Sequence, residues 1–219
     1  METKNEAVSA SYLFAAPVYH IDKPEFLEVT RKVSNKYIAK RKKEVDLNPM
    51  YPVYMTESLN YEPEMLEFSN YVAQTAWNLL SEQGYAMENF VTHFESMWCQ
   101  EHHKTSMMEK HIHGNGVQIT GFYFLDCPQD SCRVVFHDPR DSKVITSLPE
   151  VDHSKATHGS NMVNFEPKEG MLMFSSAWLP HSFTKNAAKK PMRFIHFNIL
   201  VSQASQQQHS CQSHSAEVV

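Results

Sequence analysis

Residues 111–125, HIHGNGVQITGFYFL, decide the fold of this chain. An H-x-H pair and a glycine turn precede an apolar run that is rich in β-branched and aromatic residues. Such a run, bounded by glycines, is typical of a strand. Prolines separate the similar runs around it, and no helical pattern lies between them, so we expect an antiparallel sandwich or barrel. The other predicted strands cover 90–98, 133–137, 161–165, 171–174 and 193–201.

The first half of the chain has the apolar periodicity of helices. Apolar side chains recur every three or four residues over 24–44 and again over 64–83, and Gly84 then supplies a stop signal. After Gly84 the period changes to two. The chain is therefore predicted to be mainly β with N-terminal helices. Its expected parts are a helical or irregular segment, 1–84, that packs on a β core, 85–201, followed by a flexible polar tail, 202–219, rich in Ser and Gln.

The composition narrows the functional classes. A net charge of −5 over 219 residues disfavours a nucleic-acid partner, because phosphate affinity needs clustered positive charge. No apolar run approaches the length of a membrane span, so we expect no contact with a membrane. The opening residues lack the pattern of a secretory signal, which predicts a cytoplasmic protein. The four cysteines contain no C-x-x-C pair and are expected to be free thiols.

Histidine is the most informative residue type, with 13 in the chain. Alternate residues of a strand point the same way, so His111 and His113 can aim two imidazoles at one point, as cis metal ligands do. His181 follows an apolar strand and a Trp-Leu-Pro corner, and Arg193 opens an alternating strand twelve residues later. An arginine in a core strand needs an anionic partner. Two partners stay open: the carboxylate of a ligand, or an acid of the chain such as Asp138.

These residues together resemble a known family. The stretches that carry the resemblance are HIHGNGVQITGFYFLDCP, VVFHDPR, EPKEGMLMFSSAWLPHSF and RFIHFN. They are similar to motifs of the iron(II)- and 2-oxoglutarate-dependent oxygenases, and above all to a small family of them from bacteria and phages. The resemblance covers roughly residues 90–200. It implies a double-stranded β-helix, the jelly roll of the cupins, and the cytoplasm of a bacterial or phage-infected cell.

The resemblance also implies a set of iron ligands. Carried over to this chain, they are His111, His113 and His181, which leave three positions for 2-oxoglutarate and O₂. The usual set contains two histidines and one carboxylate, and His113 stands where the acid usually stands. Asp138 is therefore the reserve ligand, because it lies in the matching HDPR segment.

The cosubstrate contacts follow in the same way. The resemblance implies that Arg193 forms a bidentate ion pair with the distal C5 carboxylate of 2-oxoglutarate. The Tyr123 hydroxyl can donate to the same carboxylate, although a core aromatic is an equal expectation at this position. Asn115 is expected to line the site. The predicted activity is hydroxylation of an unidentified small molecule or protein side chain.

Two other functions stay open at this point. A three-histidine cupin dioxygenase would need no 2-oxoglutarate, but cupins follow H-x-H with a glutamate where this chain has Gly116 and Val117. A jelly-roll binding or accessory protein without activity is the second alternative. Jelly-roll oxygenases often form dimers, so a homodimer is an expectation. Substrate specificity is expected on loops 100–110 and 138–160.

Overall fold

The structure, a computed structural model, describes residues 9–204. Most of the predicted polar tail lies outside these residues, and its first two residues belong to the last strand. The helices are α1 (Leu27–Glu44), α2 (Leu66–Glu82) and α3 (Asp141–Ile145), with 3₁₀ turns η1 (Pro24–Phe26), η2 (Pro63–Met65) and η3 (Met87–Asn89). The strands are β1 (Val18–Asp22), β2 (Val53–Met55), β3 (Phe90–His102), β4 (Met108–His111), β5 (Val117–Asp126), β6 (Val134–His137), β7 (Met162–Phe165), β8 (Met171–Ser176), β9 (His181–Phe183) and β10 (Met192–Gln203).

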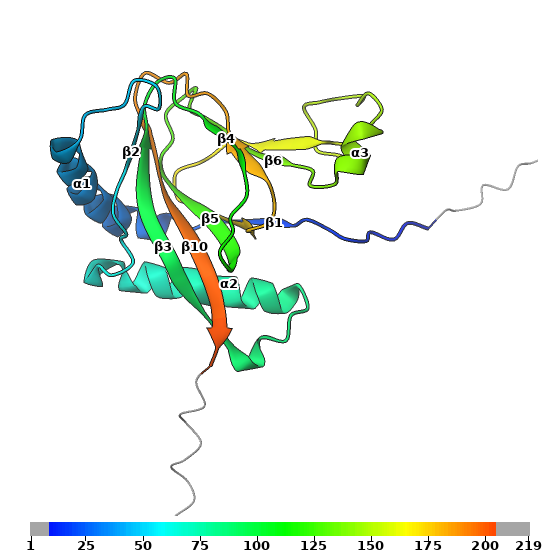
Figure 1. Cartoon of the computed structure of the whole chain (residues 1–219). Helices are drawn as coiled ribbons and strands as arrows, with labels where there is room; N and C mark the ends of the chain where they lie inside the picture. Colours follow the sequence, from blue (N-terminus) through cyan, green and yellow to red (C-terminus); the bar gives the residue numbers. More distant parts are fainter. Residues whose placement is uncertain (1–8, 205–219) are drawn as a thin grey trace, which may run out of the picture.

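The strands form two antiparallel sheets (Figure 1). The larger sheet has the order β1-β8-β5-β10-β3-β2, and the smaller one has the order β4-β9-β6-β7. Most consecutive strands of the chain lie in different sheets, as in a jelly roll. The predicted two-sheet architecture is therefore present, and every predicted strand exists.

The prediction for the N-terminal segment was incomplete. Residues 1–84 supply the two predicted helices, but they also supply β1 and β2, the edge strands of the larger sheet. Tyr19 of β1 pairs with Phe174 of β8, more than 150 residues further along the chain. Such short strands carry too little alternation to be recognised, and only the distant partner defines them.

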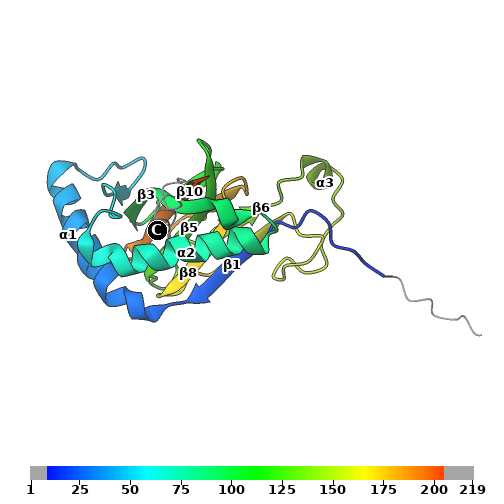
Figure 2. The same cartoon turned by 90° about the horizontal axis from the view of Figure 1, so that it is seen from below.

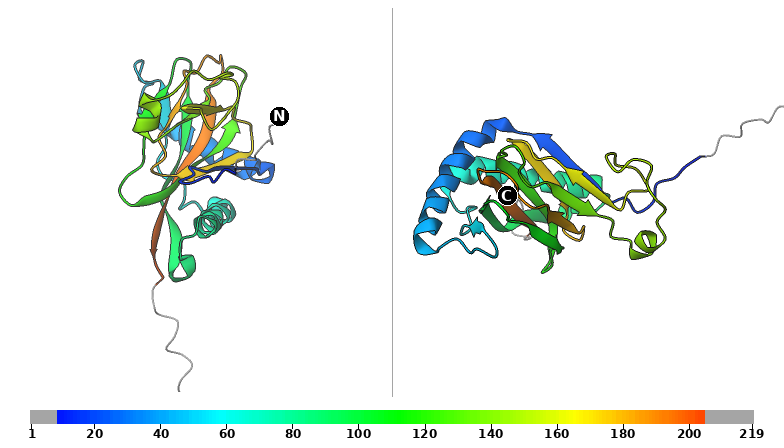
Figure 3. Two further views of the ribbon diagram at one scale, coloured as in Figure 1. Left: turned by 90° about the vertical axis from the view of Figure 1, so that its right-hand side faces the viewer. Right: turned by 90° about the horizontal axis from the view of Figure 1, so that it is seen from above.

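Helices α1 and α2 cover the outer face of the larger sheet (Figures 2 and 3). Phe68 and Val72 of α2 are fully buried against that face, and the Phe68 ring lies 5.0 Å from the ring of Tyr123 on β5. Gly84 follows α2 with a φ of +94°, in the left-handed region that favours glycine at a helix end. The larger sheet is thus buried on both faces, by helices on one and by the smaller sheet on the other.

One glycine is required by packing inside the larger sheet. A Cβ on Gly121 of β5 would lie 2.3 Å from the Met173 carbonyl oxygen and 2.3 Å from the Phe197 ring. The missing side chain therefore leaves room for the Phe197 ring and for the Met173 backbone.

Candidate metal centre

Three histidines meet between the ends of two short strands of the smaller sheet. His111 ends β4 and pairs in register with His181, the first residue of β9. His113 follows two residues after β4, where its backbone N–H donates to the Ala177 carbonyl at 3.0 Å. The possible ligand nitrogens of these three residues all lie within 4.8 Å of one another. Strand pairing and one loop hydrogen bond thus bring together side chains that are 70 residues apart.

Hydrogen bonds orient two of these rings. Nδ1 of His181 lies 3.1 Å from the Leu179 carbonyl, and Nδ1 of His111 lies 2.7 Å from the Glu109 carbonyl. A carbonyl only accepts, so each Nδ1 carries the proton and each Nε2 keeps a free lone pair. A histidine that donates through one nitrogen and ligates through the other is the usual arrangement at metal sites.

Burial keeps the imidazoles neutral. Desolvation lowers the pKa of His113 to about 4 and that of His181 to about 3, with a further lowering from the neighbouring histidines. Nε2 of both residues is buried without a hydrogen-bond partner within residues 9–204. Buried unpaired nitrogens are rare because they are costly. A divalent iron would satisfy them, so the residues present fit this metal.

The reserve ligand Asp138 does not join the three histidines. Its carboxylate accepts hydrogen bonds from Arg140 and lies 2.9 Å from the Lys143 ammonium. These two cations hold the pKa of Asp138 well below its usual range. Of the two residues considered for the third position, the structure brings His113 to His111 and His181.

Arg193 faces away from the three histidines. Its guanidinium donates to Asp126 of β5 and to Asn35 of α1, on the helix-covered side of the larger sheet. The neighbouring residue Ile195, on the same side of β10, packs in the core formed with the helices. Two kinds of partner were left open for Arg193, a ligand carboxylate or an acid of the chain, and the structure shows the second. Arg193 does not fit as the partner of the 2-oxoglutarate C5 carboxylate in this structure.

The other two expected cosubstrate contacts are also displaced. Tyr123 shares the helix-covered side, where its hydroxyl donates to the Lys23 carbonyl at 2.7 Å and burial raises its pKa. The alternative expectation for Tyr123, a core aromatic, is the one observed. Asn115 lies exposed in the turn after His113, with a φ of +55°. It is near the histidines in sequence, and no hydrogen bond of its side chain is present within the described residues.

The inner side of the barrel beyond the histidines is filled with aromatic rings. The Phe122 ring lies 5.6 Å from the His181 ring and 5.2 Å from the Phe183 ring. Phe183 and Phe194 stack at 4.9 Å, and His102 stacks on both. In this arrangement the interior offers apolar walls and, at His102, a neutral imidazole, because burial lowers the His102 pKa to about 4.

The sequence missed one neighbour of the metal centre, His196. Its ring lies 5.0 Å from the His113 ring and is almost fully buried. The Thr120 hydroxyl contacts its Nε2 at 2.9 Å and the Gln100 amide contacts its Nδ1 at 3.3 Å. Both ring nitrogens of His196 therefore have partners. His196 lies on the opposite side of β10 from Arg193, and that side faces the metal centre.

Comparisons with known proteins agree with this geometry. Residues 96–198 match the family described as "Putative 2OG-Fe(II) oxygenase", a segment that contains all three histidines. No curated protein is significantly similar in sequence. A prolyl-4-hydroxylase from Pseudomonas putida has a similar structure, with 12% identity over 85% of this chain and 94% of that chain and a TM-score of 0.54.

Two further solved structures share the fold. A viral collagen prolyl hydroxylase from Paramecium Bursaria Chlorella virus-1, in complex with 2OG, has 11% identity over 83% of this chain and 94% of that chain, with a TM-score of 0.52. SnoK, an α-ketoglutarate-dependent carbocyclase of nogalamycin biosynthesis, has 10% identity over 92% of this chain and 87% of that chain, with a TM-score of 0.61. The predicted double-stranded β-helix is confirmed.

Proposed function

Because residues 96–198 match the family described as "Putative 2OG-Fe(II) oxygenase", we propose that His111, His113 and His181 hold the iron of an oxygenase that hydroxylates its substrate. The match supports the predicted use of Fe(II) and 2-oxoglutarate. No helix among the described residues is long and apolar enough to cross a membrane. The substrate itself remains to be identified.

One observation carries this proposal: three imidazoles converge, and two of them, kept neutral by burial, have buried Nε2 atoms without a partner within residues 9–204. Bound iron would supply the activation of O₂ that carbon–hydrogen oxidation requires. The chain's own residues do the positioning. The carbonyls of Leu179 and Glu109 fix two rings, and the aromatic wall around Phe122 keeps water from that side of the site.

The three histidines are testable by metal titration in the absence of oxygen. We expect one Fe(II) per chain, and a loss of affinity of at least about a hundredfold in His181→Ala and in His113→Ala, since each removes a ligand. His93→Ala, at an exposed position on β3, is the matched control and should bind normally. Normal binding in His113→Ala together with loss in Asp138→Asn would assign the third position to the acid and contradict the proposal.

One observation favours the second candidate function, a three-histidine dioxygenase that uses no 2-oxoglutarate. Arg193 is occupied by Asp126 and Asn35, so the expected anchor for the C5 carboxylate is missing from the interior. Consumption of 2-oxoglutarate by the iron-loaded protein, measured with and without Arg193→Met, separates the two functions. Oxygen uptake without 2-oxoglutarate would favour the second one.

A further inference from the structure

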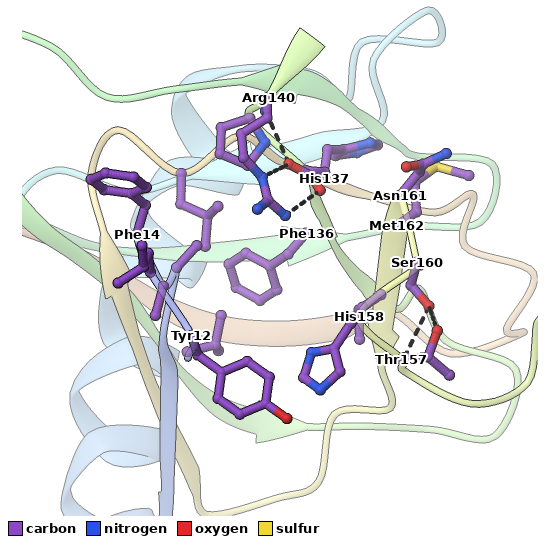
Figure 4. A pocket seen from close by; sticks show the side chains of 18 of the residues that line it. Tyr12, Phe14, Phe136, His137, Arg140, Thr157, His158, Ser160, Asn161 and Met162 are labelled. Atoms are coloured by element: carbon purple, nitrogen blue, oxygen red, sulfur yellow. Dashed lines mark hydrogen bonds and ion pairs between the residues drawn. The ribbon is translucent and has the colours of Figure 1, made fainter. Parts of the chain in front are cut away.

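A cavity of about 960 Å³ lies beside the metal centre, between the N-terminal segment and the smaller sheet (Figure 4). Its walls are residues 10–16, the end of β6 with the residues that follow it (136–140), and the segment over 157–163 that leads into β7. Tyr12 stacks on His158 with ring centroids 4.7 Å apart, so the first and the third of these walls touch. The volume is that of a site for a small organic molecule.

The cavity shares its inner wall with the metal centre. Phe136 lines the cavity and pairs in register with His181 across β6 and β9. Leu179 also lines it, and its carbonyl holds Nδ1 of His181. Trp178, half exposed, lines the cavity next to Ala177, whose carbonyl holds the His113 backbone. A ligand in this cavity therefore lies against the residues that position two of the three histidines.

The lining combines apolar side chains with polar groups at Asp138 and Arg140 and over 157–161. Phe14, Phe136, Met162 and Trp178 present aromatic and aliphatic surface. Arg140 lies at the end near Phe14 (Figure 4). The Asp138 carboxylate accepts hydrogen bonds from Arg140 Nε at 2.9 Å and from Arg140 Nη2 at 2.8 Å, and these two bonds fix the guanidinium.

The Arg140 end carries an excess of positive charge. Asp138 is one carboxylate shared between two cations, since Lys143 also lies 2.9 Å from it. Nη1 of Arg140 makes no hydrogen bond within residues 9–204 and is free to donate. Glu150 contacts the cavity wall only through Ser160, on the side away from Arg140, and lies 3.8 Å from His153. A fixed arginine with a free donor matches a carboxylate.

We propose that this cavity binds an apolar organic carboxylate, with its hydrocarbon part among the aromatic side chains and its carboxylate on Arg140. We further infer that this molecule is the substrate, which rests on the proposed function. The apolar lining favours burial of rings or alkyl chains. The Arg140 side chain is 54% exposed, so water can satisfy the free donor in the absence of a ligand. A carboxylate adds a charge-assisted hydrogen bond to this guanidinium that a neutral analogue of the same shape lacks.

The test compares two probes of equal shape. Naphthaleneacetate carries the carboxylate, and naphthaleneacetamide is its neutral counterpart. Both are titrated by calorimetry into the Fe(II)-loaded full chain without oxygen. We expect the acid to bind at least tenfold more tightly than the amide. Arg140→Gln should remove that preference and leave amide binding within about twofold. Arg133→Gln, an exposed arginine paired with Glu166 outside the cavity, is the control of equal charge and should keep the preference.

The outcomes separate the proposal from the function it extends. Equal binding of acid and amide, or an unchanged preference in Arg140→Gln, would overturn the carboxylate assignment. Displacement of the acid by 2-oxoglutarate, with loss of both in Arg140→Gln, would also overturn it and make Arg140 the cosubstrate anchor. If the chain binds the acid with the expected preference but His181→Ala leaves iron binding intact, the cavity stands and the proposed metal centre fails.

Discussion

Replacing Arg193 by methionine should weaken the fold and leave the metal centre intact. The change keeps most of the apolar stem and removes the charged bonds to Asp126 and Asn35. The Arg193 side chain is 19% exposed and that of Asp126 is 28% exposed, so this pair is less screened than a surface pair. A hydrogen bond to a charged group contributes about 1.5–3 kcal/mol. Arg31 remains 3.3 Å from Asp126 and keeps it paired, so we expect a value near the low end.

Thermal unfolding checks this magnitude. A loss of 1 kcal/mol lowers the Tm of a domain of this size by about 2–4 °C, so Arg193→Met should lower it by about 3–6 °C. Arg133→Met removes an ion pair whose side chains are 48% and 70% exposed, and should cost less than about 1 kcal/mol. Fe(II) affinity should be unchanged in both variants. An unchanged Tm together with a tenfold weaker response to 2-oxoglutarate would refute the reasoning and place Arg193 in the active site.

Three other changes test separate parts of the molecule. Asp138→Asn should destabilise the fold by about 1–3 kcal/mol at pH 7. Because its folded pKa is lowered, the contribution of Asp138 is present above its usual pKa of 3.8 and is lost as the pH falls further, so urea titrations of the two proteins should converge only below about pH 4. Gly121→Ala forces a backbone contact and should cost about 3 kcal/mol, whereas a Cβ at Gly159 would make only an ordinary contact with Thr157 Oγ1 at 3.5 Å, so Gly159→Ala should be within about 0.5 kcal/mol. Thr120→Val leaves the buried Nε2 of His196 without a partner and should cost about 1–3 kcal/mol by calorimetry, and Thr120→Ser should restore most of it.

The three predicted histidines lie together in the structure, and part of the signal for them is local. His111 and His113 are indicated by their spacing next to a glycine turn, whereas the resemblance to a known family indicated His181. The direction of Arg193 could not be predicted. Both faces of β10 are buried, one by helices and one by the smaller sheet, so Phe194 and Ile195 look alike in sequence although they face opposite ways. Without a polar face, alternation reveals which residues share a side but not which side is the inner one.

The same feature explains why His196 was missed as a neighbour of the metal. His196 and Arg193 are three residues apart, so strand alternation places their side chains on opposite sides of β10. Which side holds the metal depends on where the helices pack, and that packing involves Phe68 and Tyr123, which are 55 residues apart. Contacts of such long range leave no mark on local periodicity.

The position of β10 in the larger sheet has a consequence for biosynthesis. It pairs with β5 on one side and β3 on the other, and it leaves the ribosome after every other strand described. Until then the sheet consists of two separate halves, β1-β8-β5 and β3-β2, with exposed apolar faces and open edges. A nascent chain that stalls before residue 192 should therefore need chaperone protection, because its half-sheets can pair only with other chains.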